Sequence, residues 1–253
     1  MADPRTSVIE TRLSRINRVV AVSSGKGGVG KSMVASALAL TLARSGCRVG
    51  LLDLDFTGPS THIILGFQKV ELKEEKGIIP PTVHGLEYMS LIYFVGDKPA
   101  PLRGADVSNA IIELLAITQW GTLDYLVIDM PPGIGDAVLD LVRLIKHIEF
   151  LIITTPSLLA FETVKKQVEL LCELKMPIVG LVENMKMDKA NYVQVETRKL
   201  GLRYLGAIPF DPQVEEAIGN EVKMTETAVG KEIQQVAEKF ILPGRENGKD
   251  GLH

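Results

Sequence analysis

The chain has 253 residues, of which 46% are hydrophobic and 23% charged, and its formal net charge is −3. This composition is typical of a globular protein long enough to bury a core without disulfide or metal staples. The small negative charge gives no indication of nucleic-acid binding, and no apolar run reaches the roughly 20 residues of a membrane-spanning helix. The first residues lack the apolar core of a secretory signal. We therefore expect a cytoplasmic protein that binds neither nucleic acid nor membrane.

The metal-binding and redox side chains are few and dispersed. The chain has two cysteines, Cys47 and Cys172, and four scattered histidines, with no Cys-x-x-Cys pair. A disulfide framework, a zinc site and an iron–sulfur site within the chain are therefore not expected. We interpret both cysteines as small buried hydrophobic residues.

Short apolar runs rich in β-branched residues alternate with longer stretches of helical periodicity. Most runs are apolar throughout, which is typical of parallel strands covered on both faces. The predicted strands are 18–24, 48–53, 86–94, 125–130, 150–155, 178–183 and 203–207. The predicted helices are 31–45, 105–118, 136–146, 160–174, 191–200 and 227–242. This alternation predicts an α/β protein with three layers around a doubly wound, mostly parallel sheet of about seven strands.

The predicted domain spans residues 17–242, preceded by an arm and followed by a flexible tail at 243–253. In the arm, residues 1–16, apolar side chains at helical spacing predict a short helix. Whether this helix contacts a partner or packs on its own domain stays open. A long insertion over 56–85 follows the second strand, and long loops in compact domains are often functional.

A phosphate-binding loop is the strongest motif in the chain. The pattern Gly-x-x-x-x-Gly-Lys-Ser lies between an apolar strand and a long predicted helix. Glycines let consecutive backbone N–H groups point at phosphate oxygens, and the helix N-terminus adds positive potential. Lys31 is predicted to reach the β- and γ-phosphates, and the Ser32 hydroxyl to ligate Mg²⁺. The predicted ATP- or ADP-binding residues here are Gly25, Lys26, Gly27, Gly28, Val29, Gly30, Lys31, Ser32 and Met33.

Three aspartates lie at or just beyond the ends of predicted strands and complete a predicted ATPase site. Asp129 closes the apolar run 123–129 and precedes Met-Pro-Pro-Gly-Ile-Gly-Asp, a loop able to sense the γ-phosphate. Asp53 and Asp55 lie at the end of the second strand, two positions apart and therefore on one side. One can orient water for attack while the other steadies the waters of the metal. The predicted metal residues are Ser32, Asp53, Asp55 and Asp129.

These motifs resemble a known group of proteins. Gly-Lys-Gly-Gly-Val-Gly-Lys-Ser is similar to the deviant Walker A motif of the Mrp/MinD/ParA ATPases, of which the extra lysine, Lys26, is the mark. The stretch 123–136 resembles the Mrp branch, as do Asp-Phe-Thr-Gly-Pro-Ser at 55–60, Glu-Asn-Met at 183–185 and Ile-Pro-Phe-Asp-Pro at 208–212. The likeness is nearly collinear from about residue 18 to residue 240 and implies a P-loop fold like that of MinD and NifH.

The resemblance also implies roles for individual residues. Such proteins bind ATP as homodimers, with the residue matching Lys26 reaching the nucleotide of the partner subunit. Lys26, Lys31 and Asp55 would be catalytic, Asp55 by positioning the attacking water. Asn184 together with Pro209, Phe210 and Asp211 would hold adenine. Hydrolysis would be slow and would operate a switch.

One departure from the Mrp pattern leads to a narrower hypothesis. The branch that carries iron–sulfur clusters has a Cys-x-x-Cys soon after its Glu-Asn-Met, whereas this chain has no cysteine there. Without thiolates a bridging cluster cannot be held. The chain looks more like a cysteine-free archaeal branch that includes the HypB-type ATPase of nickel–iron hydrogenase maturation. The motifs that carry this likeness include Asp-Pro-Arg at 3–5, Leu-Asp-Phe at 54–56, Val-His-Gly at 83–85 and Pro-Leu-Arg-Gly at 101–104. We therefore expect a metallocentre-maturation ATPase that works beside a small HypA-like nickel metallochaperone.

Three alternatives remain. The first is an iron–sulfur cluster carrier of the Mrp type, which the missing Cys-x-x-Cys disfavours. A MinD-like membrane positioner needs a basic amphipathic C-terminal helix, but the polar side of the predicted helix 227–242 balances Lys231 and Lys239 against Glu232 and Glu238. A ParA-like DNA-segregation ATPase needs a basic surface, and charge and spacing indicate none. We expect the C-terminal helix to dock on the core.

Overall fold

The computed structural model describes residues 3–56, 58–67, 71–95 and 104–245. Ten strands are defined in these segments: β1 (Ile16–Ser24), β2 (Val49–Asp53), β3 (Lys73–Glu74), β4 (Ile78–Ile79), β5 (Thr82–Val83), β6 (Leu86–Ser90), β7 (Leu123–Asp129), β8 (Ile148–Thr154), β9 (Ile178–Lys186) and β10 (Tyr204–Pro209). The helices are α1 (Arg5–Leu13), α2 (Lys31–Arg44), α3 (Thr61–Leu65), α4 (Ile92–Val95), α5 (Ala105–Ile117), α6 (Asp136–Leu144), α7 (Leu158–Glu173), α8 (Tyr192–Lys199), α9 (Gln213–Ala217), α10 (Glu221–Glu226) and α11 (Ala228–Arg245). The sequence predicted the longer elements to within a few residues.

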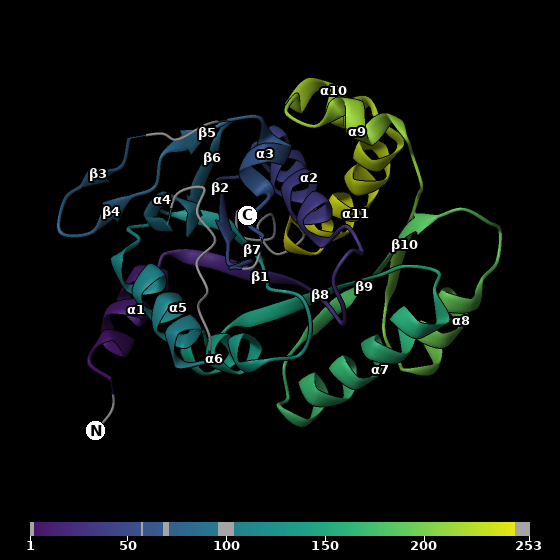
Figure 1. The fold of residues 1–253 in the computed structure, drawn as a ribbon, viewed down its shortest axis with the longest axis horizontal. Helices are drawn as coiled ribbons and strands as arrows, with labels where there is room; N and C mark the ends of the chain where they lie inside the picture. Colours follow the sequence, from purple (N-terminus) through teal and green to yellow (C-terminus); the bar gives the residue numbers. More distant parts are fainter. Residues whose placement is uncertain (1–2, 57, 68–70, 96–103, 246–253) are drawn as a thin grey trace, which may run out of the picture.

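Eight strands form one sheet in the order β10-β9-β8-β1-β7-β2-β6-β5, and β3 and β4 form a separate hairpin (Figure 1). Seven strands of the sheet run parallel, and β5 pairs antiparallel with β6 at the edge. The prediction of a mostly parallel sheet is confirmed. The eighth strand, β5, lies in the predicted insertion and pairs with β6. It has only two residues, which is too short to give a periodic signal in the sequence.

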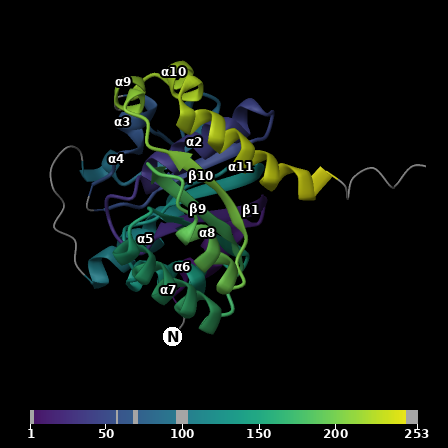
Figure 2. The same cartoon turned by 90° about the vertical axis from the view of Figure 1, so that its right-hand side faces the viewer.

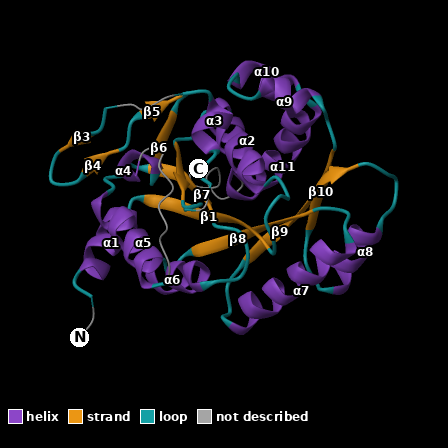
Figure 3. Cartoon of the chain, in the orientation of Figure 1, coloured by secondary structure: helices purple, strands orange, loops and turns teal. Residues whose placement is uncertain are grey.

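Helices cover both faces of the sheet, as Figures 2 and 3 show. On one face, α2 and α11 bury apolar side chains against alternate residues of β1, β2, β7 and β8. On the other, α5, α6 and α7 join a second core cluster with the remaining strand residues. Because each strand is covered on both sides, its apolar run is continuous rather than alternating. The predicted three-layer arrangement is confirmed.

Two terminal helices belong to this core. The predicted N-terminal helix packs beside α5 and α6, with Ile9 and Leu13 buried, so these residues cover the helix's own domain. Helix α11 packs on α2 and β10, with Ile233, Val236 and Ala237 buried, as expected for a docked C-terminal helix. It extends to Arg245, into the predicted tail, whereas residues 246–253 lie outside the described residues.

Two sequence expectations are wrong in detail. The strand expected over 86–94 ends at Ser90, whose hydroxyl accepts a hydrogen bond from the Ile92 backbone N–H at 3.3 Å, and α4 begins there. Cys172 is exposed on α7 and Cys47 is half-buried, so neither is the buried hydrophobic residue expected.

In the described part of the chain, none of the helices is both long and apolar enough to cross a bilayer. The cytoplasmic location stays a prediction.

Candidate nucleotide-binding site

The phosphate-binding loop connects the end of β1 to the first residue of α2. Gly28 and Gly30 have φ angles of 77° and 79°, in the left-handed region that glycine adopts without strain. A Cβ atom at Gly30 would also lie 2.3 Å from Asn184 Nδ2, and one at Gly25 would lie 2.5 Å from Thr163 Oγ1 on α7. The glycines therefore allow both the turn and its close packing against neighbouring elements.

Lys31, at the start of α2, is buried and faces two aspartates. Its Nζ lies 2.5 Å from Asp129 Oδ1 at the end of β7 and 3.7 Å from Asp55 Oδ2. The same ammonium lies 3.3 Å from the Ser32 hydroxyl oxygen. Because β7 lies between β1 and β2, its carboxyl end brings Asp129 directly beside the loop. The structure thus brings Lys31, Ser32, Asp55 and Asp129 into one cluster.

Asp53 is fully buried and uses both carboxylate oxygens within the protein. Oδ1 accepts the Asp55 backbone N–H at 3.0 Å, and Oδ2 accepts the Thr61 hydroxyl at 2.6 Å and the Thr61 N–H at 3.3 Å. Asp53 therefore holds the chain between Asp55 and the start of α3. Its predicted part in a metal site stays a prediction.

Burial shapes the electrostatics of this cluster. Desolvation raises the pKa of Asp53, although the Thr61 hydroxyl and nearby Lys31 oppose the rise. Desolvation likewise raises the pKa of Asp129 to about 7, against the opposing charge of Lys31. Asp129 Oδ2 is buried and has no hydrogen-bond partner among the described residues. A cation arriving with phosphate would therefore meet a carboxylate oxygen that is not otherwise used.

This donor set fits Mg²⁺ as that ion is usually bound beside nucleotides. Hydroxyl and carboxylate oxygens are suitable hard ligands, and Mg²⁺ commonly keeps several waters while taking only one or two protein oxygens and the substrate phosphates. Within the described ranges, His, Cys, Asp and Glu side chains form no group of three arranged to hold a metal by themselves. The site therefore suits a metal that arrives with nucleotide.

Asn184 lies against the phosphate loop. It lies near the carboxyl end of β9, is buried, and donates its side-chain amide to the carbonyl oxygen of Val29 at 2.9 Å. This hydrogen bond braces the phosphate loop directly. A contact between Asn184 and adenine stays a prediction.

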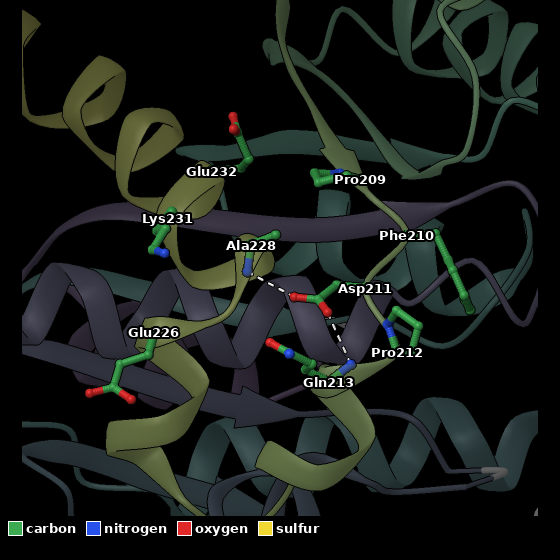
Figure 4. Close-up of a pocket in the computed structure, with 9 residues that line it drawn as sticks. All are labelled: Pro209, Phe210, Asp211, Pro212, Gln213, Glu226, Ala228, Lys231 and Glu232. Carbon is green, nitrogen blue, oxygen red and sulfur yellow. Dashed lines mark hydrogen bonds between the residues drawn. The ribbon is translucent and has the colours of Figure 1, made fainter.

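The other predicted adenine residues line an open pocket of about 720 Å³ between β10, α9 and α11 (Figure 4). The Phe210 side chain is 54% exposed. Asp211 Oδ1 accepts the Gln213 N–H at 2.9 Å, and its Oδ2 accepts the Ala228 N–H at 2.9 Å. Asp211 therefore holds the first turns of α9 and α11 together beside the pocket. Adenine binding by Pro209, Phe210 and Asp211 stays a prediction.

The loop after Asp129 lies against the phosphate loop. The Gly133 N–H donates to the Ser24 carbonyl oxygen at 3.0 Å, and a Cβ atom at Gly27 would lie 3.8 Å from Pro132. Lys26, by contrast, is exposed. Residues 101–103 of the Pro-Leu-Arg-Gly motif lie outside the described residues.

Sequence reasoning missed three residues of this region: Thr61, Tyr88 and Thr163. Thr61 opens a helix of five residues, too short for a periodic signal. Tyr88 looks like one apolar residue among others in a strand, and only the position of its hydroxyl marks it. Thr163 lies well inside a predicted helix, where nothing in the sequence links it to Gly25.

Comparison with known proteins decides the family. The family model described as the NUBPL iron-transfer P-loop NTPases, in the ParA group, matches residues 15–241. The chain belongs to this family. It is 36% identical to a protein of Saccharolobus solfataricus named iron–sulfur cluster carrier protein, over 92% of this chain and 86% of that one. A Pseudomonas fragi protein of the same name is 44% identical over 68% of this chain, but the match spans 62% of that relative's length.

A solved structure gives the same result for the fold. A nucleotide-binding protein from Archaeoglobus fulgidus, solved in complex with ADP, superposes with a TM-score of 0.73 and is 29% identical. The superposition covers 91% of this chain and 92% of that one. The predicted Mrp/MinD-like P-loop fold is therefore confirmed.

The narrower hypothesis of hydrogenase maturation is wrong. The relatives are named as iron–sulfur cluster carriers, and the family is described by iron transfer, so the comparisons do not support closeness to the HypB-type ATPases. The expected HypA-like nickel partner has no support either. The error arose because the absence of a Cys-x-x-Cys pair was interpreted as the mark of a different branch.

Proposed function

We propose that this chain is a Mg²⁺-dependent ATPase that acts in the delivery of iron–sulfur clusters. The observation that carries the ATPase is the cluster in which buried Lys31 lies between Asp129 and Asp55 at the phosphate loop. Lys31 and the loop N–H groups would bind the phosphates, Ser32 and Asp129 would serve Mg²⁺, and Asp55 would orient the attacking water. The names of the relatives support the delivery of clusters.

The cluster is the cargo in this proposal, and its thiolate ligands come from outside these 253 residues. Iron–sulfur clusters are held by several cysteine thiolates, and this chain has two cysteines in all. They lie on separate elements, Cys47 just after α2 and Cys172 within α7. In this proposal the nucleotide state of this chain controls the transfer of the cluster to another protein.

The cargo proposal is tested by capture under anaerobic conditions. We expect the tagged chain, with Mg²⁺ and a non-hydrolysable ATP analogue, to retain iron and acid-labile sulfide together with bound protein. The same chain with ADP, or the tagged Lys31→Met variant with the ATP analogue, should retain much less iron, sulfide and bound protein. Captured protein without iron and sulfide would contradict the delivery of clusters.

A second measurement locates the thiolates. After anaerobic reconstitution with iron and sulfide, we expect the isolated chain to lack stoichiometric thiolate-to-iron absorption. Cys172→Ser is the control, because Cys172 is the exposed cysteine. Stoichiometric absorption that disappears in Cys172→Ser would show that this chain itself holds the cluster.

We also propose that ATP drives formation of a homodimer through the face that bears Lys26. Lys31 already provides the buried charge of the loop, whereas Lys26 is exposed and free to face a second phosphate group. With ATP and Mg²⁺, light scattering should show a dimer for the wild type and a monomer for Lys26→Ala. Lys146→Ala, which removes another exposed lysine, should still dimerise. A stable ATP-dependent dimer of Lys26→Ala would rule out this role.

A further inference from the structure

Tyr88 carries a buried hydroxyl group that contacts Thr61, the residue that holds Asp53. It lies in β6, is fully buried, and its Oη is 2.8 Å from the Thr61 hydroxyl oxygen. Phe67 meets the Tyr88 ring edge-on, with ring centroids 4.7 Å apart, and so limits its movement. A buried phenol needs a hydrogen-bond partner, and the Tyr88 hydroxyl has one at the start of α3.

The proton positions follow from the chemistry of the three groups. Thr61 donates its single hydroxyl proton to Asp53 Oδ2 at 2.6 Å. It must then act as acceptor toward Tyr88, so the phenol donates to Thr61. The result is an ordered chain in which Tyr88 donates to Thr61 and Thr61 donates to Asp53.

The chain of hydrogen bonds continues to Asp55. The other oxygen of Asp53 accepts the Asp55 backbone N–H at 3.0 Å, and the Asp55 carboxylate lies 3.7 Å from Lys31 Nζ. Asp53 can hold this N–H only while its carboxylate stays in one orientation, and Thr61 fixes that orientation from the far side. Tyr88 lies two residues before Ser90 on β6, and Ser90 pairs in register with Asp53 on β2. The position of Asp55 therefore depends on Tyr88.

We propose that Tyr88 and Thr61 are positioning residues for ATP hydrolysis, which hold the Asp55 main chain in place through Asp53. The proposal rests on the ATPase function proposed above. Neither residue needs to touch nucleotide. Outer partners of this kind keep functional groups within a narrow range of positions, and their loss commonly lowers activity by about 10- to 100-fold.

Tyr93 provides a matched control for the tyrosine. It lies in α4, its ring centroid is 6.0 Å from that of Tyr88, and its hydroxyl is buried. Among the described residues, no hydrogen-bond partner of the Tyr93 hydroxyl is present. Tyr88→Phe and Tyr93→Phe therefore each remove one buried hydroxyl from the same cluster, but only the first breaks the chain to Asp53.

The test combines kinetics with amide hydrogen exchange. For Thr61→Val, which keeps the shape and removes the hydroxyl, we expect kcat to fall about 10-fold or more with KM within about threefold, because the loss is in orientation rather than binding. Thr61→Ser should restore kcat. Tyr88→Phe should lower kcat several-fold, and Tyr93→Phe should leave it unchanged. Without nucleotide, the Asp55 amide should exchange faster in Thr61→Val and Tyr88→Phe, and at the wild-type rate in Tyr93→Phe.

The outcomes separate this inference from the ATPase proposal. Equal effects of Tyr88→Phe and Tyr93→Phe on kcat and on Asp55 exchange would overturn it, because both would then act only through core stability. A Thr61→Ser variant as impaired as Thr61→Val would also overturn it. If the wild type hydrolyses no ATP, the ATPase proposal fails, and the exchange measurement still decides whether Tyr88 holds Asp55.

Discussion

Replacing Lys31 by methionine is expected to destabilise the folded protein by about 3–5 kcal/mol, the usual effect of removing one member of a buried ion pair. The Lys31 ammonium is 2.5 Å from Asp129, a fully buried carboxylate whose second oxygen already has no partner among the described residues. Methionine fills the space of the lysine stem, so the loss reports charge rather than a cavity. Urea unfolding at pH 8 measures the change.

The same variant should regain part of its stability in acid. Desolvation raises the pKa of Asp129 to about 7 even with Lys31 present, and removing Lys31 raises this pKa further. A carboxyl group whose pKa is raised by folding destabilises the folded state as pH rises from its unfolded pKa through its folded pKa. At pH 6 Asp129 is protonated in the variant, so the deficit relative to wild type should be smaller than at pH 8. An equal deficit at both pH values would contradict this account.

Nucleotide affinity provides the second readout for Lys31→Met. A hydrogen bond to a charged group contributes about 1.5–3 kcal/mol, so ATP affinity should fall roughly 10- to 100-fold. For the stability measurement, Lys26→Ala is the control, because Lys26 is an exposed lysine of the same loop. Its stability should change by no more than about 0.5 kcal/mol, as is usual for surface substitutions. Unaltered ATP binding in Lys31→Met would remove Lys31 from the phosphate site.

Asp55→Asn is expected to lower kcat for ATP hydrolysis by about 10²–10⁴-fold, the usual contribution of a positioned acid or base. Asparagine keeps the shape of the side chain and an oxygen able to accept the Gly58 N–H, which lies 3.3 Å from Asp55 Oδ1. The backbone bond from Asp55 to Asp53 is also unaffected. ATP affinity should stay within about threefold, because a water-orienting carboxylate acts in the transition state.

The control for this prediction is Asp124→Asn. Asp124 lies on β7 near its amino end, far from Asp129, and pairs with the exposed Arg48 at 2.9 Å. Its replacement should leave both kcat and ATP affinity unchanged. Single-turnover hydrolysis and equilibrium binding of a fluorescent ATP analogue separate the two quantities. Equal losses of binding and hydrolysis in Asp55→Asn would assign Asp55 to ground-state binding instead.

The sequence alone was enough to predict the layers of the fold and the phosphate loop. A strand covered on both faces must be apolar throughout, so strands such as 150–155 are visible without any tertiary information. The loop is visible because phosphate binding requires glycines, a lysine and a hydroxyl at fixed spacing between a strand and a helix. Asp129 and Asp55 were found for a related reason, since Asp129 is the last residue of a buried strand and Asp55 lies two residues beyond another.

The short elements were not predicted, because contacts from distant segments stabilise them. Helix α3 is capped by Gly66, which lies so close to Gly219 that a Cβ atom there would be 2.1 Å from the Gly219 carbonyl oxygen. The helix propensities of residues 61–65 give no indication of this long-range contact. The strand predicted over 86–94 continued too far because the apolar run does not stop at Ser90, whereas the residues from Ile92 onward form α4.

The sequence by itself determined the family, the P-loop and the identity of the charged residues that follow the strands. Tertiary structure alone decided their pairing: Lys31 meets Asp129 across 98 positions of sequence because β7 lies between β1 and β2. It also decided that Asn184 braces Val29 and that Tyr88 reaches Asp53 through Thr61. These contacts depend on strand order and on distances of a few ångströms. Side-chain spacing along the chain specifies neither, because hydrogen bonds form only between atoms that the folded backbone brings together.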